Sequence, residues 1–274
     1  MIDEIVVCLD GSLFAEKIIP YARGIAGSTG AKLRFLRVVE NERELAAAER
    51  YVEGFARHLK VEGKVKMAQA DAVSAILEDL KEHPAAMPAI TTHGKSGLLE
   101  MVAGSVALGV IWGAGKPVLL YRPPAGAPAQ EADRETKISS VVAALDGSEF
   151  SEKILPQAVE IAGSLRAKLQ LVQVLSLEEQ SEIPVEVRRD VLETSYLRRK
   201  AEEIRRMYGI EADWDALHGE PAEALCSYIH GRQDVMLAMT SHARAGVERV
   251  IFGSVAGECV RRAGVLIMIY WPHP

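Results

Sequence analysis

The sequence predicts an α/β fold of two tandem domains, each a five-stranded parallel sheet with helices on both faces. Two observations carry this prediction. The segment from Asp10 to Leu33 matches the segment from Asp146 to Leu169 at 16 of 24 positions, with a constant offset of 136 residues, which identifies an internal repeat. In each copy, short apolar runs alternate with longer helical patterns, as in parallel strands joined by crossover helices.

The elements of the first copy follow in a regular order. The run EIVVCL at residues 4–9 has the length and the apolar composition of a buried strand. A helix is predicted from Ser12, because Asp-Gly-Ser favours a strand-to-helix corner. The later elements are predicted as strand 33–39, helix 42–59, strand 64–69, helix 72–81, strand 87–91, a loop, a helix from Ser105 and strand 117–121. Ligands of such sheets bind outside the carboxyl ends of the strands.

The second copy is longer than the first. Beyond the first repeat the offset becomes 149, so the second copy carries 13 extra residues, which we expect to lengthen the helix around residues 187–209. The segment 124–136 is rich in Pro, Ala, Gly and charge and has nothing to bury, so it is predicted to be a linker. The predicted domains are therefore residues 1–123 and 137–274.

Composition excludes several classes of function. The net charge of -6 argues against broad binding to nucleic acid or to acidic membranes, because both need an excess of Lys and Arg. Three cysteines without CxxC spacing suggest neither a disulfide framework nor a zinc site. No apolar run approaches the roughly 20 residues of a membrane span, and the first residues are acidic where a signal peptide is basic. We expect a cytoplasmic protein without a metal site.

A loop rich in small residues follows the fourth strand of each copy. It reads TTHGKSGLLEMVAGS from residue 91 and TSHARAGVERVIFGS from residue 240. Ser105 and Ser254 are expected to be helix N-caps, and a Gly-rich approach to a helix N-terminus suits a phosphate. The alternative is that Gly-Ser merely starts a helix, but the repeated spacing favours phosphate binding, more strongly in the first copy. GxxxxGK[ST] and a GxGxxG after the first strand are both absent.

These residues resemble those of tandem universal stress proteins, whose ATP-binding members carry Gly-x2-Gly-x9-Gly-[Ser/Thr] after the fourth strand and an Asp that ends the first. The likeness covers nearly the whole chain outside the linker. It implies adenine-nucleotide α-hydrolase-like, Rossmann-like domains that bind ATP, with Mg²⁺ as a candidate companion of the phosphates. It also implies a stress-response role and an intramolecular pseudo-dimer of the two domains, and it leaves a homodimer open.

The resemblance also implies a set of site residues in each copy. In the first copy the adenosine is expected at Cys8, Asp10, Val38 and Thr91, beside His93, and the phosphates at Gly94, Gly104, Ser105 and Val106. The matched positions in the second copy are Ala144, Asp146, Val174, Thr240, His242, Ala243, Gly253, Ser254 and Val255. From the residues alone, the two aspartates can equally be turn residues, and the two histidines hydrogen-bonded supports.

This chain departs from the family motif at three positions. Thr91 and Thr240 replace the first Gly, and Ala243 replaces the middle Gly of the second copy. If that position needs φ > 0, alanine costs on the order of 1 kcal/mol or more, so the first site ranks above the second.

Two other functions were weighed. One is an interaction protein with vestigial pockets, in which the apolar final strands at 117–121 and 265–270 seek a partner; we expect them to pair with each other. The other is an ATP-dependent enzyme, which would need a positioned base and metal-binding carboxylates. No such constellation is evident, so the chain is predicted not to be an enzyme, and any ATP hydrolysis is predicted to be slow.

Overall fold

The computed structural model describes residues 2–92, 104–124, 126, 132–175, 189–241 and 252–272, with the backbone alone for 189–194. The chain divides into a first unit, Met1–Lys137 with Leu266–Pro274, and a second unit, Ile138–Val265. Among the described helices, none combines the length and the apolar character that crossing a bilayer requires.

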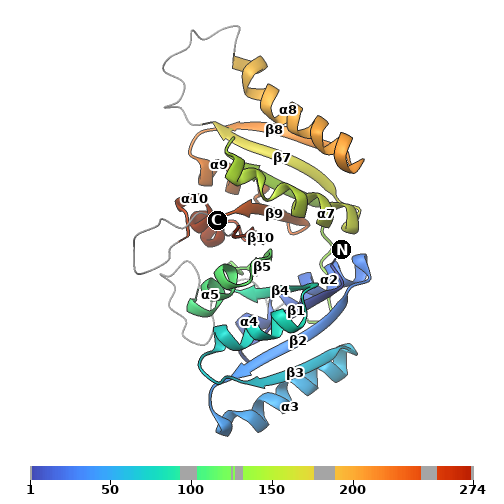
Figure 1. The fold of residues 1–274 in the computed structure, drawn as a ribbon, viewed down its shortest axis with the longest axis vertical. Coiled ribbons are helices and arrows are strands. Elements are labelled where there is room, and N and C mark those ends of the chain that lie inside the picture. The colour runs from blue at the N-terminus through green and yellow to red at the C-terminus, as the bar shows by residue number, and fades with distance from the viewer. Residues whose placement is uncertain are drawn as a thin grey trace. The chain divides into compact units, whose positions relative to one another are not determined.

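The first unit is a mostly parallel sheet with strand order β3-β2-β1-β4-β5-β10 (Figure 1). Its strands are β1 (Glu4–Cys8), β2 (Lys32–Val39), β3 (Glu62–Met67), β4 (Ala86–Thr91), β5 (Val118–Tyr121) and β10 (Leu266–Tyr270). Its helices are α1 (Leu13–Glu16), α2 (Ile19–Thr29), α3 (Glu42–Leu59), α4 (Ala72–Glu82) and α5 (Ser105–Gly113). Strands β1, β4 and β5 are almost continuously buried, as expected of parallel strands covered on both faces.

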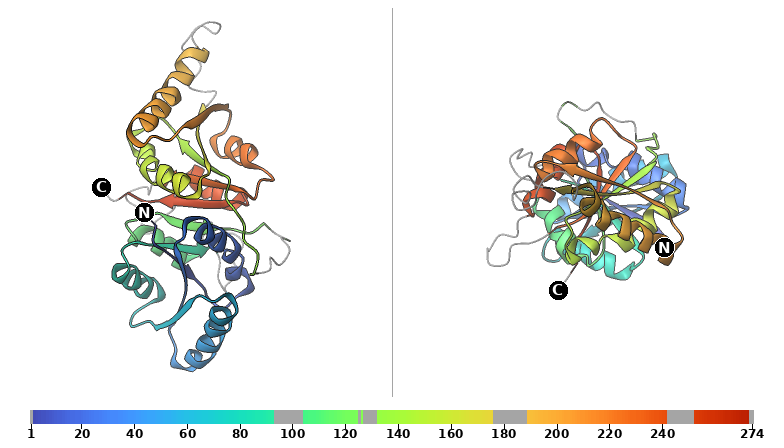
Figure 2. Two further views of the ribbon diagram at one scale, coloured as in Figure 1. Left: turned by 90° about the vertical axis from the view of Figure 1, so that its right-hand side faces the viewer. Right: turned by 90° about the horizontal axis from the view of Figure 1, so that it is seen from above.

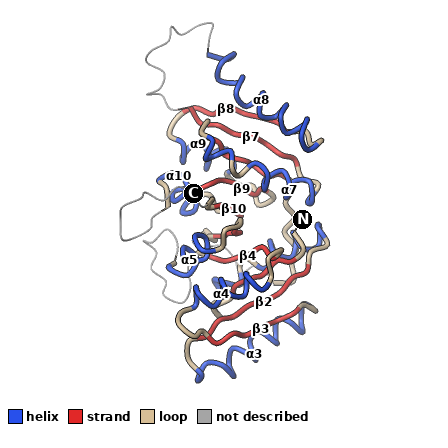
Figure 3. The backbone as a smooth tube through the Cα atoms, in the orientation of Figure 1, coloured by secondary structure: helices blue, strands red, loops and turns tan. Residues whose placement is uncertain are grey.

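The second unit repeats this plan with four parallel strands in the order β9-β6-β7-β8. The strands are β6 (Ser140–Leu145), β7 (Lys168–Leu175), β8 (Ala212–His218) and β9 (Val235–Thr240). The helices are α6 (Glu149–Glu152), α7 (Leu155–Leu165), α8 (Arg189–Tyr208), α9 (Pro221–Ile229) and α10 (Ser254–Arg262). Within this unit α7 and α8 cover one face of the sheet and α9 and α10 the other, and α2 and α3 lie opposite α4 and α5 in the first unit (Figures 2 and 3).

The predicted α/β class and the tandem repeat are confirmed, and the strand arrangement differs in one detail. Strand β10, the last strand of the second copy, pairs antiparallel with β5 of the first copy, with Leu266 opposite Tyr121, and so belongs to the first unit. The prediction that the two final strands pair inside the chain is thus confirmed. All four residues of β5 are buried, and without β10 their backbone would form an apolar open edge.

One expectation about the chain segments is borne out in part and another needs correction. Helix α8 has 20 residues and α3 has 18, so the expected lengthening is seen for two residues, and residues 176–188 before α8 lie outside the described part of the chain. The end of the predicted linker does bury surface, because the Thr136 N–H donates to the Pro20 carbonyl at 2.8 Å and Thr136 is buried. Gly24 of α2 allows this approach, since a Cβ there would lie 2.0 Å from the Thr136 carbonyl oxygen.

Candidate functional site

Each unit has a cavity at the carboxyl ends of its parallel strands. The first-unit cavity has a volume of about 520 Å³ and is lined from the ends of β1, β2 and β4 and the start of α5. The second-unit cavity has a volume of about 320 Å³ and is lined from β6, β7, β9 and the starts of α9 and α10. Both volumes suit a small molecule, and the position is the one where α/β sheets bind ligands.

The structure gathers the described site residues of each copy around its cavity. The first cavity is lined by Cys8, Asp10, Val38, Thr91, Gly104, Ser105 and Val106. The second is lined by Ala144, Asp146, Val174, Thr240, Gly253, Ser254 and Val255. His93, Gly94, His242 and Ala243 lie outside the described residues. Residues up to 111 positions apart in the chain, such as Ala144 and Val255, therefore line one cavity, because the strand ends share one edge of the sheet.

The first-strand aspartates hold the turn that leads into the first helix. Asp10 Oδ1 accepts hydrogen bonds from the Ser12 N–H at 2.9 Å and from the Ser12 hydroxyl at 2.6 Å. The Ser12 hydroxyl in turn accepts from the Ala15 N–H and caps α1. Asp146 and Ser148 repeat both distances in the second unit. The turn role of these aspartates is thus shown, and their place on the cavity wall is compatible with ligand contact as well.

The last helices begin one residue earlier than they would if the serines were their N-caps. Gly104 and Gly253 are the N-caps of α5 and α10, in extended backbone conformation and without a side-chain hydrogen bond to the helix. Ser105 and Ser254 are exposed first residues of these helices, so the expectation that they are N-caps is wrong. Because glycine supplies no capping oxygen, the positive helix ends face the cavity walls without a side-chain cap at that position.

The Gly104 position is also tightly enclosed. A Cβ at Gly104 would lie 3.1 Å from the Thr92 carbonyl oxygen, to which the Gly104 N–H donates a hydrogen bond. The backbone therefore approaches this wall more closely than a side chain there would allow without displacement.

Cys8 has the position expected from the sequence, but its chemistry is quiet. Burial raises the pKa of the Cys8 thiol to about 12, with the nearby Asp79 charge adding to the effect. The group is therefore a neutral thiol at physiological pH and not an activated thiolate. Thr91, which takes the place of the first motif glycine, is buried beside it on the cavity wall.

Sequence reasoning missed the charged residues of the first cavity. Arg37, Glu40 and Glu44 line it, whereas Asp146 is the one charged side chain among the residues that line the second cavity. The available signal was Arg37 itself, a cation inside the buried strand LRFLRVV and directly before Val38. The matched residue in the second unit, at the offset of 136, is Gln173.

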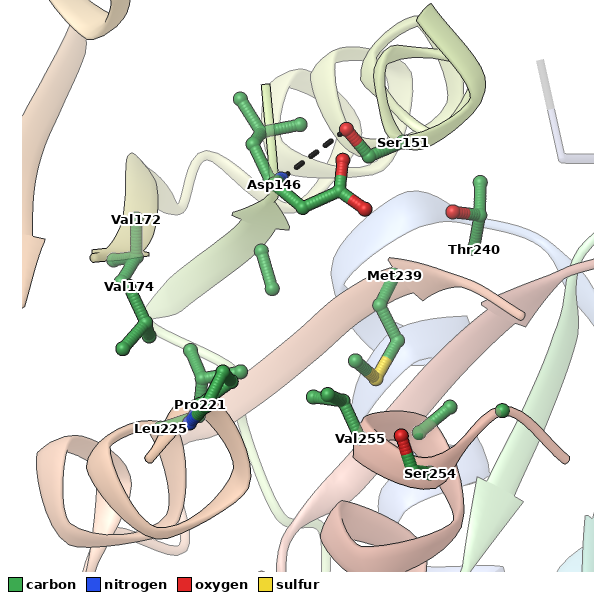
Figure 4. Close-up of a pocket in the computed structure, with 14 residues that line it drawn as sticks. Asp146, Ser151, Val172, Val174, Pro221, Leu225, Met239, Thr240, Ser254 and Val255 are labelled. Carbon is green, nitrogen blue, oxygen red and sulfur yellow. Dashed lines mark hydrogen bonds between the residues drawn. The ribbon is translucent and has the colours of Figure 1, made fainter. Parts of the chain in front are cut away.

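The second cavity is the more apolar of the two. Pro221, Leu225 and Met239 add to its wall, and Figure 4 shows Met239 of β9 and Val255 of α10 pointing toward each other. The Asp146 N–H donates to the Ser151 hydroxyl at 3.2 Å, marked by the dashed line in Figure 4. This cavity offers a ligand chiefly van der Waals contacts.

Among the described residues, one cluster has the composition of a metal site. Asp79, Glu82 and His83 place ligand atoms within 4.8 Å of one another. Asp79 is already bound by Arg34 at 2.7 Å and by Lys64 at 2.8 Å, and none of the three residues lines either cavity. Two cations on one carboxylate disfavour a third, so we assign no metal here.

Comparison with known proteins identifies the family. A model of the Universal stress protein family matches residues 1–122 and 137–270. Universal stress protein MJ0531 of Methanocaldococcus jannaschii is 21% identical over 141 residues, which cover 49% of this chain and 83% of that protein.

Two solved structures resemble the chain over nearly its whole length. A universal stress protein from Archaeoglobus fulgidus covers 100% of both chains with a TM-score of 0.67 and 19% identity. A putative universal stress protein from Pseudomonas aeruginosa covers 99% of this chain and 94% of its own, with a TM-score of 0.65 and 16% identity. This chain therefore belongs to the universal stress protein family and carries two copies of its domain.

Proposed function

We propose that this chain is a regulatory stress-response protein that binds an adenine nucleotide, ATP, in the first-unit cavity. The observation that supports the proposal most directly is the convergence of seven residues matched to the family's ATP motif on one cavity of about 520 Å³. A universal stress protein has been solved in complex with cAMP, so an adenine nucleotide is a ligand of at least that family member.

Two features of the first cavity fit such a ligand. The uncapped start of α5 favours phosphate oxygens, because its dipole and free N–H groups attract an anion. Asp10 lies in the turn after β1, where Ser12 fixes its carboxylate, and this carboxylate can accept hydrogen bonds from ribose hydroxyls. ATP would serve as a bound signal and not as the substrate of rapid chemistry, because the described cavity residues include no group activated to act as a base or nucleophile.

Mg²⁺ would accompany the phosphates without a dedicated protein site. Asp10 supplies the one carboxylate of the first cavity that lies on the floor formed by the strand ends, and Glu40 and Glu44 are exposed at its rim. Mg²⁺ commonly keeps several waters and takes its other ligands from the phosphates, so this arrangement does not exclude it.

Equilibrium dialysis with labelled ATP tests the proposal. We expect about one ATP per chain, because the second cavity is smaller and the second copy has Ala243 where the first copy keeps the motif glycine Gly94. Gly104→Asp should abolish this binding, since its side chain meets the Thr92 carbonyl and its charge repels phosphate. Gly253→Asp is the matched control in the second unit and should leave the stoichiometry near one.

Two results would count against this function. Uptake near zero at millimolar ATP would reject nucleotide binding and favour a role through protein–protein interaction. Binding that survives Gly104→Asp but is lost in Gly253→Asp would reverse the assignment of the site to the first unit.

A further inference from the structure

Arg37 is a largely buried cation that forms no ion pair with another described residue, although the carboxylates of Asp10, Glu40 and Glu44 line the same cavity. It lies near the end of β2, lines the first cavity and is only 8% exposed. No described residue accepts a hydrogen bond from its guanidinium or forms an ion pair with it. The guanidinium instead stacks on the Tyr51 ring, with its Cζ atom 5.1 Å from the ring centroid. A guanidinium has five N–H donors, and the Arg37 nitrogens are not among the fully buried polar atoms that lack a partner, so these donors are available to a ligand in the cavity.

The neighbouring arginine of the same strand shows what a satisfied environment looks like. Arg34 is 1% exposed and donates to Glu4 Oε1 at 3.0 Å and to Asp79 Oδ2 at 2.7 Å. Arg37, three residues later and on the other face of the strand, has neither carboxylate. The difference indicates that the N–H donors of Arg37 remain available to a molecule in the cavity.

The surroundings hold Arg37 in place at the cavity wall. Its guanidinium packs so closely on Gly11 that a Cβ there would lie 2.3 Å from Nη1. Tyr51, which supports the guanidinium, donates its hydroxyl to Glu16 Oε1 at 2.9 Å and is thereby fixed. A planar cation stacked on an anchored ring, with its edge at a cavity, is preorganised to bind an oxyanion in a bidentate manner.

We propose that Arg37 binds a phosphate group of the ligand and makes the first-unit cavity selective for phosphorylated nucleotides over nucleosides. The identity of the ligand as an adenine nucleotide rests on the proposed function, whereas the need for an anion rests on Arg37 alone. The second unit lacks this selectivity, because Gln173 occupies the matched position and packs less closely on its turn glycine, with Nε2 3.3 Å from a Cβ built on Gly147.

The test measures the affinities of ATP, AMP, adenosine and tripolyphosphate for the full chain by isothermal titration calorimetry. Arg37→Gln installs the residue of the second unit. It should weaken ATP binding by about tenfold or more, as expected for the loss of a charge-assisted hydrogen bond, and leave adenosine binding within about twofold. Arg57→Gln, an exposed position near the far end of α3, makes the same charge change outside the cavity and should alter neither affinity.

A structural role for Arg37 predicts a different pattern. Removing an unpaired buried charge should leave the thermal midpoint of the ligand-free protein unchanged or higher, whereas Arg34→Gln should lower it. Equal weakening of ATP and adenosine together with a lower midpoint for Arg37→Gln would overturn the proposal, because the residue would then only support the fold.

The remaining outcomes separate this proposal from the function on which it rests. If the wild type binds ATP and Arg37→Gln binds it equally well, the role of Arg37 is rejected and nucleotide binding stands. If the wild type binds tripolyphosphate in an Arg37-dependent manner but none of the adenine ligands, the anion site stands and the adenine assignment fails. If it binds none of the four probes, both are rejected.

Discussion

Replacing Asp79 by Asn should destabilise the first unit far more than replacing Tyr228 by Phe destabilises the second. Asp79 is 0% exposed and accepts hydrogen bonds from Arg34 Nη2 at 2.7 Å and from Lys64 Nζ at 2.8 Å. Arg34 also pairs with Glu4, so four charged groups from three strands and α4 form one network.

The second unit has a hydrogen-bonded network without an ion pair at the corresponding position. Tyr228 matches Asp79 at the offset of 149, and its hydroxyl accepts from Gln170 Nε2 at 3.1 Å and donates to Asp215. Ser140, the match of Glu4, donates to Gln170 Oε1 at 2.7 Å. The two units thus fill the same space in the fold with different chemistry, which makes each a control for the other.

The expected magnitudes follow from burial and charge. Asp79→Asn leaves Arg34, itself only 1% exposed, with one carboxylate instead of two, and breaking a buried ion pair typically costs about 3–5 kcal/mol. Tyr228→Phe removes the two hydrogen bonds of a half-buried hydroxyl. A hydrogen bond between neutral groups typically contributes about 0.5–1.5 kcal/mol to stability, and one to a charged acceptor about 1.5–3 kcal/mol. We therefore expect the larger loss at Asp79.

The loss at Asp79 should depend on pH. Burial by itself raises the pKa of Asp79, but the hydrogen bonds and charges of Arg34 and Lys64 outweigh it, so the pKa in the folded protein lies below the ordinary value of 3.8. A lowered pKa gives stability that is present above the unfolded pKa and is lost as the pH falls through the folded pKa. The gap between wild type and Asp79→Asn should persist from neutral pH to about pH 4 and narrow below it.

Urea unfolding followed by circular dichroism measures the loss of stability in each variant. Hydrogen exchange, read by mass spectrometry on peptides of β1–β3 and β6–β8, assigns each loss to its unit. The combined replacement Glu4→Ser, Arg34→Gln, Lys64→Asp and Asp79→Tyr transfers the network of the second unit and should recover much of the loss. Equal losses for Asp79→Asn and Tyr228→Phe, or a gap at Asp79 that grows in acid, would refute the reasoning.

Two further outcomes are expected. Gly24→Ala should destabilise the first unit by about 1–3 kcal/mol, because the new Cβ would lie 2.0 Å from the Thr136 carbonyl oxygen. Gly27→Ala in the same helix meets only the Glu135 side chain at 3.4 Å and should stabilise the unit by up to about 1 kcal/mol. Thermal melts in which Gly24→Ala is the more stable variant would contradict this packing. In the native protein Cys8 should react with iodoacetamide at pH 7.5 more slowly than Cys226. Burial raises the pKa of Cys8 to about 12, whereas a hydrogen bond with Cys259 lowers the pKa of Cys226. Peptide mass spectrometry that finds Cys8 alkylated faster than Cys226 would contradict this prediction.

The candidate sites were predictable to the extent that they depend on position along strands. Asp10 lies two residues after the end of β1, and Thr91 ends β4; parallel strands bring their carboxyl ends to one edge whatever side chains they carry. The helix start was misplaced by one residue because the choice between Gly104 and Ser105 as N-cap depends on backbone angles and not on capping preference.

The sequence by itself determined the repeat, the order of strands and helices and the edge of the sheet where ligands bind, because periodicity and internal identity are properties of the chain alone. Only the tertiary structure decided that Arg34 pairs with two carboxylates, those of Glu4 and Asp79, and that the Thr136 N–H bonds to the Pro20 carbonyl. These features depend on groups 30 or more residues apart, whose distances arise only when the sheet and its helices pack.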